Sequence, residues 1–268
     1  MSIVEEYYDS IVEDEWERLE RHKVEFDITK RYLEEYINEP SKILDVGGGP
    51  GRYSIFLAEN GYDVTLLDLS SENISLARKK STEADVEIKK FVHANALEMS
   101  DCISEKFDVV LCMGPMYHLV DKNDRINVIR ECMKRLKEGG LLFVAFISSY
   151  APIIDLIKNY PESIVDNKEN TLNFLKDGKN IVNEDNSGFT NAFFINPLEI
   201  ELFMDKFSLD KKVITGVEGL PGQSEEKLNS LSEEAYQEWI DLIYRTSTNP
   251  MTWASCEHFL YIGEKIKK

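Results

Sequence analysis

Short apolar runs alternate with amphipathic stretches in the first half of the chain. The apolar runs cover residues 43–46, 64–67, 91–92, 107–112 and 141–147. Most are separated by stretches with apolar residues at helical spacing, over residues 52–60, 71–80 and 125–136. Continuous apolar runs of this length are typical of parallel strands that are covered on both faces. The pattern therefore predicts a parallel sheet with helices on both faces between residues 41 and 149.

The flanking segments follow other patterns. Residues 1–40 predict two amphipathic helices that end before Pro40 and form an N-terminal cap. Residues 150–195 carry polar runs at 166–170 and 183–188, and so long a connection is usually functional or disordered. We expect an insertion over the ligand edge of the sheet, with a loose surface connector as the alternative. Residues 196–268 should complete the sheet with helices at 197–207 and 225–243 and strands at 213–217 and 258–262.

Charge and composition narrow the function. The formal net charge of −18 disfavours a nucleic-acid substrate, because such proteins normally need a basic surface to neutralise phosphates. The sequence contains no run of about 18 apolar residues, so it predicts no membrane span. The acidic N-terminus does not resemble a signal peptide. Four scattered cysteines predict neither a zinc site nor a disulfide framework, which favours the cytoplasm. The sequence does not address the oligomeric state.

A glycine cluster follows the first predicted strand. Gly47, Gly49 and Gly51 form a G-x-G-x-G pattern, whereas a dinucleotide site would need a glycine where Arg52 stands. Glycines in such a turn allow a ligand to approach the main chain closely. The second predicted strand ends at Asp68, whose carboxylate can accept hydrogen bonds from both ribose hydroxyls of a nucleotide.

This arrangement resembles motif I of the class I S-adenosylmethionine-dependent methyltransferases. The segments 93–98, 107–113, 136–142 and 257–263 resemble further motifs of that family, although Asn95 stands where an acid is usual. The resemblance implies an α/β fold with a doubly wound, mostly parallel, seven-stranded sheet, and S-adenosylmethionine as the cofactor. It implies cofactor contacts from Asp45, Gly47, Gly48, Gly49, Gly51, Asp68, Leu69, Asn95, Ala96 and Met113.

Other residues are candidates through their chemistry. Tyr8, Arg18 and Arg52 could contact the methionine end of the cofactor, whose carboxylate suits an arginine. For Arg18 the alternative is an ion pair with Asp14, one helical turn away. After the fourth predicted strand, His118 could act as a general base near neutral pH, and Tyr117 could shape the acceptor pocket. A structural role is the alternative for both residues.

Methyl transfer mainly requires alignment and exclusion of water, because the cofactor already carries an activated methyl group. The leading hypothesis is a methyltransferase that acts on a small-molecule acceptor. Three alternatives remain open: a methyltransferase for protein or RNA, a non-catalytic protein that binds the cofactor, and a nicotinamide-dependent oxidoreductase. The sequence does not indicate which atom of the acceptor is methylated.

Overall fold

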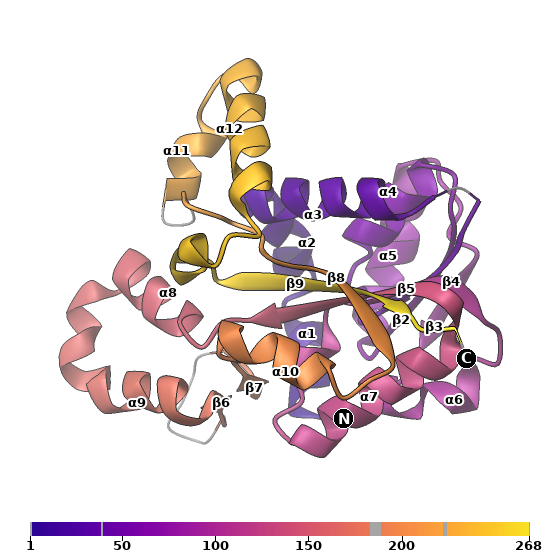
Figure 1. Ribbon diagram of the computed structural model, residues 1–268, viewed down its shortest axis with the longest axis horizontal. Helices are drawn as coiled ribbons and strands as arrows, with labels where there is room; N and C mark the ends of the chain where they lie inside the picture. Colours follow the sequence, from indigo (N-terminus) through magenta and orange to yellow (C-terminus); the bar gives the residue numbers. More distant parts are fainter. Residues whose placement is uncertain (1, 39, 183–188, 222–223, 268) are drawn as a thin grey trace.

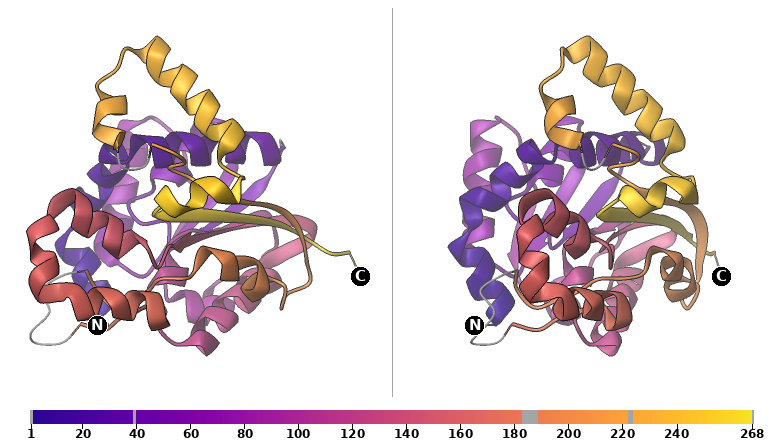
Figure 2. Two further views of the ribbon diagram at one scale, coloured as in Figure 1. Left: turned by 60° about the vertical axis from the view of Figure 1, so that its left-hand side comes forward. Right: turned by 90° about the vertical axis from the view of Figure 1, so that its left-hand side faces the viewer.

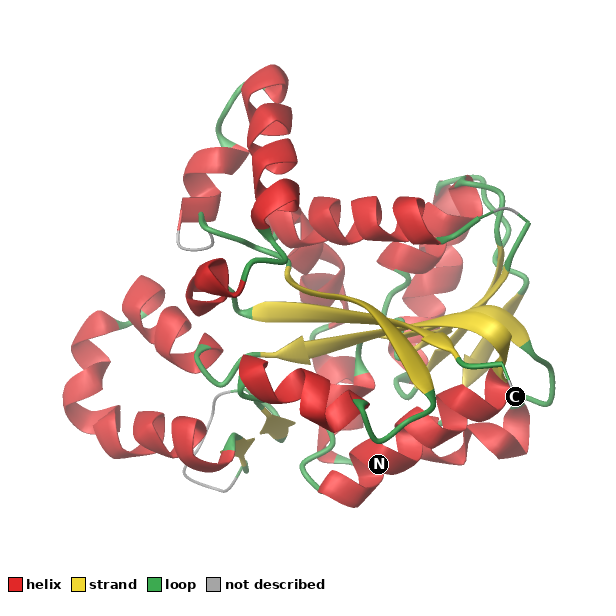
Figure 3. Cartoon of the chain, viewed as in Figure 1, coloured by secondary structure: helices red, strands yellow, loops and turns green. Residues whose placement is uncertain are grey.

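A seven-stranded sheet forms the centre of the computed structural model, which describes residues 2–38, 40–182, 189–221 and 224–267. The strand order is β3-β2-β1-β4-β5-β9-β8, with β9 antiparallel to both of its neighbours and β1 to β5 parallel (Figures 1 and 3). The predicted α/β fold class is confirmed. The strands span Lys42–Val46 (β1), Asp63–Asp68 (β2), Lys90–His93 (β3), Phe107–Cys112 (β4), Leu136–Ile147 (β5), Leu209–Gly216 (β8) and His258–Lys265 (β9).

Helices cover both faces of this sheet. Successive strand residues point to opposite faces, so Ile43 packs in one core while Leu44 packs in the other. The Ile43 face is covered by α3 (Lys23–Tyr36), α4 (Arg52–Glu59), α5 (Ser71–Glu83) and α12 (Glu233–Thr246). The Leu44 face is covered by α6 (Met99–Cys102), α7 (Lys122–Arg135) and α10 (Ile200–Met204).

The N-terminal segment forms three helices where two were predicted. They are α1 (Ile3–Ser10), α2 (Val12–Arg21) and α3. A capping box between Ser2 and Glu5 starts α1, and none of its eight residues is buried. Helix α1 therefore contacts the rest of the protein through side chains that remain partly exposed.

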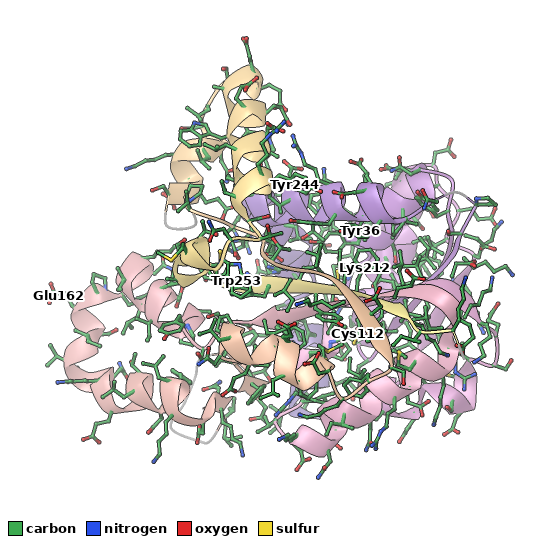
Figure 4. The ribbon with its side chains drawn as sticks, in the orientation of Figure 1. Tyr36, Cys112, Glu162, Lys212, Tyr244 and Trp253 are labelled. Carbon is green, nitrogen blue, oxygen red and sulfur yellow. The ribbon has the colours of Figure 1, made fainter. Side chains whose placement is uncertain are left out.

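The insertion contains more regular structure than its polar runs predicted. It forms α8 (Ala151–Asn159), a 3₁₀ turn (Pro161–Ser163), α9 (Ile164–Asp177) and a two-stranded pair, β6 (Lys179–Asn180) with β7 (Ala192–Phe193). The first polar run lies inside α9, and the second, residues 183–188, lies outside the described residues. Figure 2 shows α8 and α9 standing away from the sheet, and Figure 4 places Glu162 at their outer end.

The C-terminal helices also differ from the prediction. The single helix expected at 225–243 is two helices, α11 (Glu225–Asn229) and α12, because Ser232 caps a new helix by accepting from the Ala235 N–H. The helix expected at 197–207 is a 3₁₀ turn (Pro197–Glu199) followed by the short α10. Within the described residues, no helix combines the length and apolar character that a membrane crossing requires.

Candidate active site

A cavity of about 240 Å³ lies at the carboxyl ends of β1 to β4, beneath α1 and α2. This is somewhat below the range typical of small-ligand sites, roughly 300–1,000 Å³. Ligands of open α/β sheets bind at this edge, where the strand order reverses beside β1. The wall is formed by Ser2, Val4, Tyr8, Glu15, Gly47, Gly49, Leu67, Asp68, Leu69, Asn73, Ala94, Asn95, Ala96, Gly114, Pro115, Tyr117, His118 and Leu119.

The glycine turn after β1 combines two different steric requirements. At Gly49 (φ +56°) an added Cβ would meet no described atom within 4 Å, so bare backbone faces the open cavity. At Gly48 a Cβ would lie 2.6 Å from the Asp45 carboxylate, and at Gly47 it would lie 2.7 Å from the Pro115 ring. The expected close approach of a ligand therefore fits Gly49, whereas Gly48 and Gly47 are required by packing within the protein.

Asp68 is fixed at the end of β2 by three hydrogen bonds. Its Oδ2 accepts from the Gly49 N–H at 2.8 Å, while Oδ1 accepts from the Ser70 N–H at 2.9 Å and from the Asn73 side chain at 3.3 Å. Burial raises the pKa of Asp68, and these donors oppose the shift. A carboxylate offers about four acceptor positions, so one remains for a hydroxyl that enters the cavity. A second hydroxyl contact requires one of the present donors to move.

Asp45 lies behind the glycine turn and does not line the cavity. It is 1% exposed and accepts a hydrogen bond from the Ser54 hydroxyl at 2.7 Å. Burial raises its pKa to about 7, and the charge of Asp68 adds to that effect. The structure places Gly48, Gly51, Arg52 and Met113 outside the cavity wall as well.

The far end of the cavity is lined by the segments that follow β2 and β3. Leu69, Ala94 and Ala96 contribute apolar surface beside Asn95. The Asn95 side-chain oxygen accepts from the Leu97 N–H at 3.0 Å and starts a 3₁₀ turn (Ala96–Glu98). The amide therefore points its oxygen to its own turn, which leaves its NH₂ group as the donor for an adenine edge.

His118 and Tyr8 meet on the opposite side. The Tyr8 hydroxyl lies 2.8 Å from His118 Nε2, although 110 residues separate them in the chain. Burial lowers the pKa of His118 to about 4, and the Asn191 backbone opposes this shift. Among the described residues, no atom forms a hydrogen bond of good geometry with Nδ1. The imidazole is therefore neutral at pH 7. With the proton on Nδ1, the Nε2 lone pair accepts from Tyr8.

Aromatic rings surround this pair. The His118 ring centroid lies 4.7 Å from that of Tyr117 and 5.7 Å from that of Phe189 in the insertion. Tyr7 of α1 also contacts Phe189, with centroids 5.8 Å apart. Burial raises the pKa of Tyr117, so its hydroxyl stays protonated at neutral pH. The cap and the insertion thus touch each other beside the catalytic candidates.

Neither candidate arginine lines the cavity. Arg18 donates to both Glu25 carboxylate oxygens, at 2.8 and 3.1 Å, and to Glu15 at 3.3 Å. The alternative partner, Asp14, was wrong, because the chain turns between α2 and α3 and brings Glu25 back to Arg18. Arg52 instead stacks its guanidinium over the Trp16 ring, 4.5 Å from the centroid.

A buried ionic cluster continues from Arg18 toward β9. His258 Nδ1 lies 2.5 Å from Glu218 and 3.5 Å from Glu25. The two carboxylates raise the pKa of His258 to about 9 despite its burial, and Arg18 with His258 holds the pKa of Glu25 down at about 2. One oxygen of Glu25, one oxygen of Glu218 and one ring nitrogen of His258 lie within 4.8 Å of one another, a spacing that metal sites also use. In this structure the group forms ion pairs that join α3, β9 and the segment after β8.

Sequence reasoning missed several wall residues. Asn73 and Glu15 sit on helices whose position over the sheet edge no local pattern reveals. Phe189 of the insertion contacts His118. The sequence predicted only that the insertion lies over the ligand edge, and not which of its residues would reach the site. Gly114 could have been found, because a Cβ there would lie 2.5 Å from the Gly47 carbonyl once β1 and β4 are paired.

Known proteins share this architecture. A family profile described as "Methyltransferase domain" matches residues 43–140. A ubiquinone biosynthesis O-methyltransferase from Aliivibrio fischeri is 31% identical over 176 residues, which cover 66% of this chain and 67% of the relative.

Two solved structures with bound S-adenosylhomocysteine share the fold at 14% identity. The 1,6-didemethyltoxoflavin-N1-methyltransferase of Burkholderia thailandensis has a TM-score of 0.59, with 99% of this chain and 88% of that chain covered. Magnesium protoporphyrin IX methyltransferase from Synechocystis has a TM-score of 0.58, with 98% of each chain covered. The matches assign S-adenosylmethionine as the methyl donor and exclude the oxidoreductase alternative. The chain belongs to the class I S-adenosylmethionine-dependent methyltransferases, and it is an enzyme of that family.

Proposed function

We propose that the enzyme methylates a small molecule whose acceptor atom carries a proton, and that His118 accepts this proton. The observation that carries the proposal is the position of His118 on the cavity wall, where its Nε2 lies 2.8 Å from the Tyr8 hydroxyl. The burial that lowers the pKa of His118 keeps its imidazole neutral, and a neutral imidazole can act as a general base through the Nε2 lone pair that now accepts from Tyr8. Tyr8 orients the ring and can give way to the acceptor hydroxyl or amine.

The cofactor supplies an activated methyl group when bound. We assign its ribose to Asp68, its adenine to the wall formed by Leu69, Asn95 and Ala96, and its close approach to the main chain to Gly49. Gly47 also lines the cavity beside Gly49. An indirect role remains in this proposal for the residues that shape the glycine turn and the strand ends beside it, which are Asp45, Gly48, Gly51, Arg52 and Met113.

The acceptor should enter between the cap and the insertion. Tyr117 forms an apolar wall there, and Phe189 contributes a ring from residues 150–195, which we propose as a lid that excludes water. The net charge of −18 disfavours an RNA acceptor and is compatible with a small molecule. The relatives named for ubiquinone biosynthesis and 1,6-didemethyltoxoflavin also act on small molecules. Reduced cysteines support a cytoplasmic location as part of this proposal.

Calorimetric titration with S-adenosylhomocysteine tests the cofactor assignment. Asp68→Ala should weaken binding at least about 100-fold, because hydrogen bonds to a charged group contribute roughly 1.5–3 kcal/mol each. Asp63→Ala, at the opposite end of β2, is the matched control and should bind like the unmodified protein. Unchanged affinity in Asp68→Ala would contradict the assignment.

Transfer of a radiolabelled methyl group to a panel of small phenols and heterocyclic amines tests the proton acceptor. For an acceptor that the unmodified enzyme methylates, His118→Gln should lower kcat by about 10²- to 10⁴-fold, the range for loss of a general base. Its affinity for S-adenosylhomocysteine should stay the same. A kcat within about threefold of the unmodified enzyme would remove His118 from the reaction.

A further inference from the structure

The charges on the cavity wall are unbalanced. Of its described residues, Asp68 and Glu15 carry carboxylates, and none is a lysine or an arginine. His118 is neutral at pH 7. The wall itself therefore carries an excess of negative charge, which suits a ligand that brings positive charge.

Glu15 is only partly neutralised by its neighbours. Its side chain is 22% exposed, and its one described charged partner is the Arg18 Nε at 3.3 Å. The two terminal nitrogens of Arg18 are directed at Glu25 in a bidentate pair, which is the stronger contact. Burial removes water from the Glu15 carboxylate and raises its pKa. A positively charged group of a ligand could replace the lost water and stabilise the ionised form.

The two carboxylates serve different parts of the cavity. Asp68 belongs to the end of β2, where the Gly49 N–H and the N-terminus of α5 hold it. Glu15 belongs to α2, which covers the cavity as part of the cap. With the ribose at Asp68, the amino-acid portion of the cofactor is the part that can reach α2.

We propose that Glu15 binds the ammonium group of the amino-acid portion of S-adenosylmethionine. This inference rests on the proposed binding mode with the ribose at Asp68. The sequence predicted a different contact at the methionine end of the cofactor, in which the Arg18 guanidinium binds the carboxylate. In the structure Arg18 is a positioning residue, which holds Glu15 through Nε while it is itself held by Glu25.

Two ligands separate this contact from the rest of the site. S-adenosylhomocysteine has the amino-acid portion, whereas 5′-methylthioadenosine lacks it and keeps the adenosine. Calorimetry should show that Glu15→Gln weakens S-adenosylhomocysteine about 10- to 100-fold, as expected for loss of one hydrogen bond between charged groups. The affinity for 5′-methylthioadenosine should change by less than about twofold. Glu15→Asp, which keeps the charge, should recover part of the loss.

Glu17→Gln is the matched control, because Glu17 lies on the same helix, is exposed and pairs with Arg21. It should leave both affinities unchanged. Equal weakening of both ligands by Glu15→Gln would overturn the inference and assign Glu15 to cap structure. Unchanged affinity for both would also overturn it. Failure of the proposed binding mode gives a different result, since Asp68→Ala would then leave 5′-methylthioadenosine binding intact.

Discussion

The ionic cluster around His258 makes stability depend on pH in the alkaline range. In the folded chain Glu25 and Glu218 raise the pKa of His258 from 6.5 to about 9. One pKa unit corresponds to about 1.4 kcal/mol, so the protonated imidazole contributes about 3 kcal/mol to folding. The side chain is only 19% exposed, so solvent screens this contribution little. A contribution of this size is a large part of the stability of a typical domain.

The sign follows from proton binding. Because the folded state holds this proton more tightly than the unfolded state, the contribution is complete below about pH 6.5. It decreases as the pH rises and is lost above about pH 9. We therefore expect the free energy of unfolding to fall by about 3 kcal/mol between pH 6 and pH 10 through this residue.

Urea unfolding at intervals between pH 6 and pH 10 measures this decrease. His258→Gln is the comparison variant, because glutamine can still donate to Glu218 but cannot take up a proton. The difference between the two proteins should be largest near pH 6 and should shrink toward pH 10. If the two curves stay parallel over this range, the charge of His258 does not stabilise the fold and the reasoning is refuted.

Other substitutions separate packing from ligand contact. Gly47→Ala should lower stability by about 1–3 kcal/mol, because its φ of +69° disfavours a side chain and the Cβ would meet Pro115. Gly49→Ala should cost only about 1–2 kcal/mol yet weaken S-adenosylhomocysteine at least about tenfold, which urea unfolding and calorimetry can compare. For a substrate found in the panel, kcat/KM should show no inflection from His118 between pH 6 and pH 9, because its pKa is about 4; an inflection near pH 6.5 that disappears in His118→Gln would contradict this. Tyr8→Phe should reduce kcat without loss of fold, measured by activity and circular dichroism.

The sheet could be predicted because each strand carries its own pattern. Apart from Asp45 and Thr65, residues 43–46 and 64–67 are apolar and point to both faces of the sheet, and helices do cover both faces. The insertion could not be predicted in this way. In α9 the apolar residues Val165, Leu172 and Leu175 remain exposed, so the helix does not follow the rule that apolar positions face a core.

The site was predictable only where it follows the strand ends. Gly49 is the third residue after β1, and Asp68 is the last residue of β2, so parallel pairing brings them together. Arg18 and Glu25 are seven residues apart and would not meet on one straight helix, but the chain changes direction at His22 between α2 and α3. That change depends on packing against the sheet, which no short segment encodes.

The first two helices of the cap, α1 and α2, bury few side chains, and this has a consequence for function. In α1 no residue is buried, and in α2 only Leu19 is. The contacts that hold these helices include hydrogen bonds from Ser70 to Asp9 and between Tyr8 and His118, together with the Arg18–Glu25 pair. Polar contacts at a partly wet surface each contribute little, so we expect α1 to separate from the sheet edge at a smaller cost than α3, whose residues lie in the core. The cap also carries wall residues of the cavity, so a ligand that binds beneath it adds contacts across the same boundary. We therefore expect cofactor binding to stabilise the packing of α1 and α2 against the sheet edge.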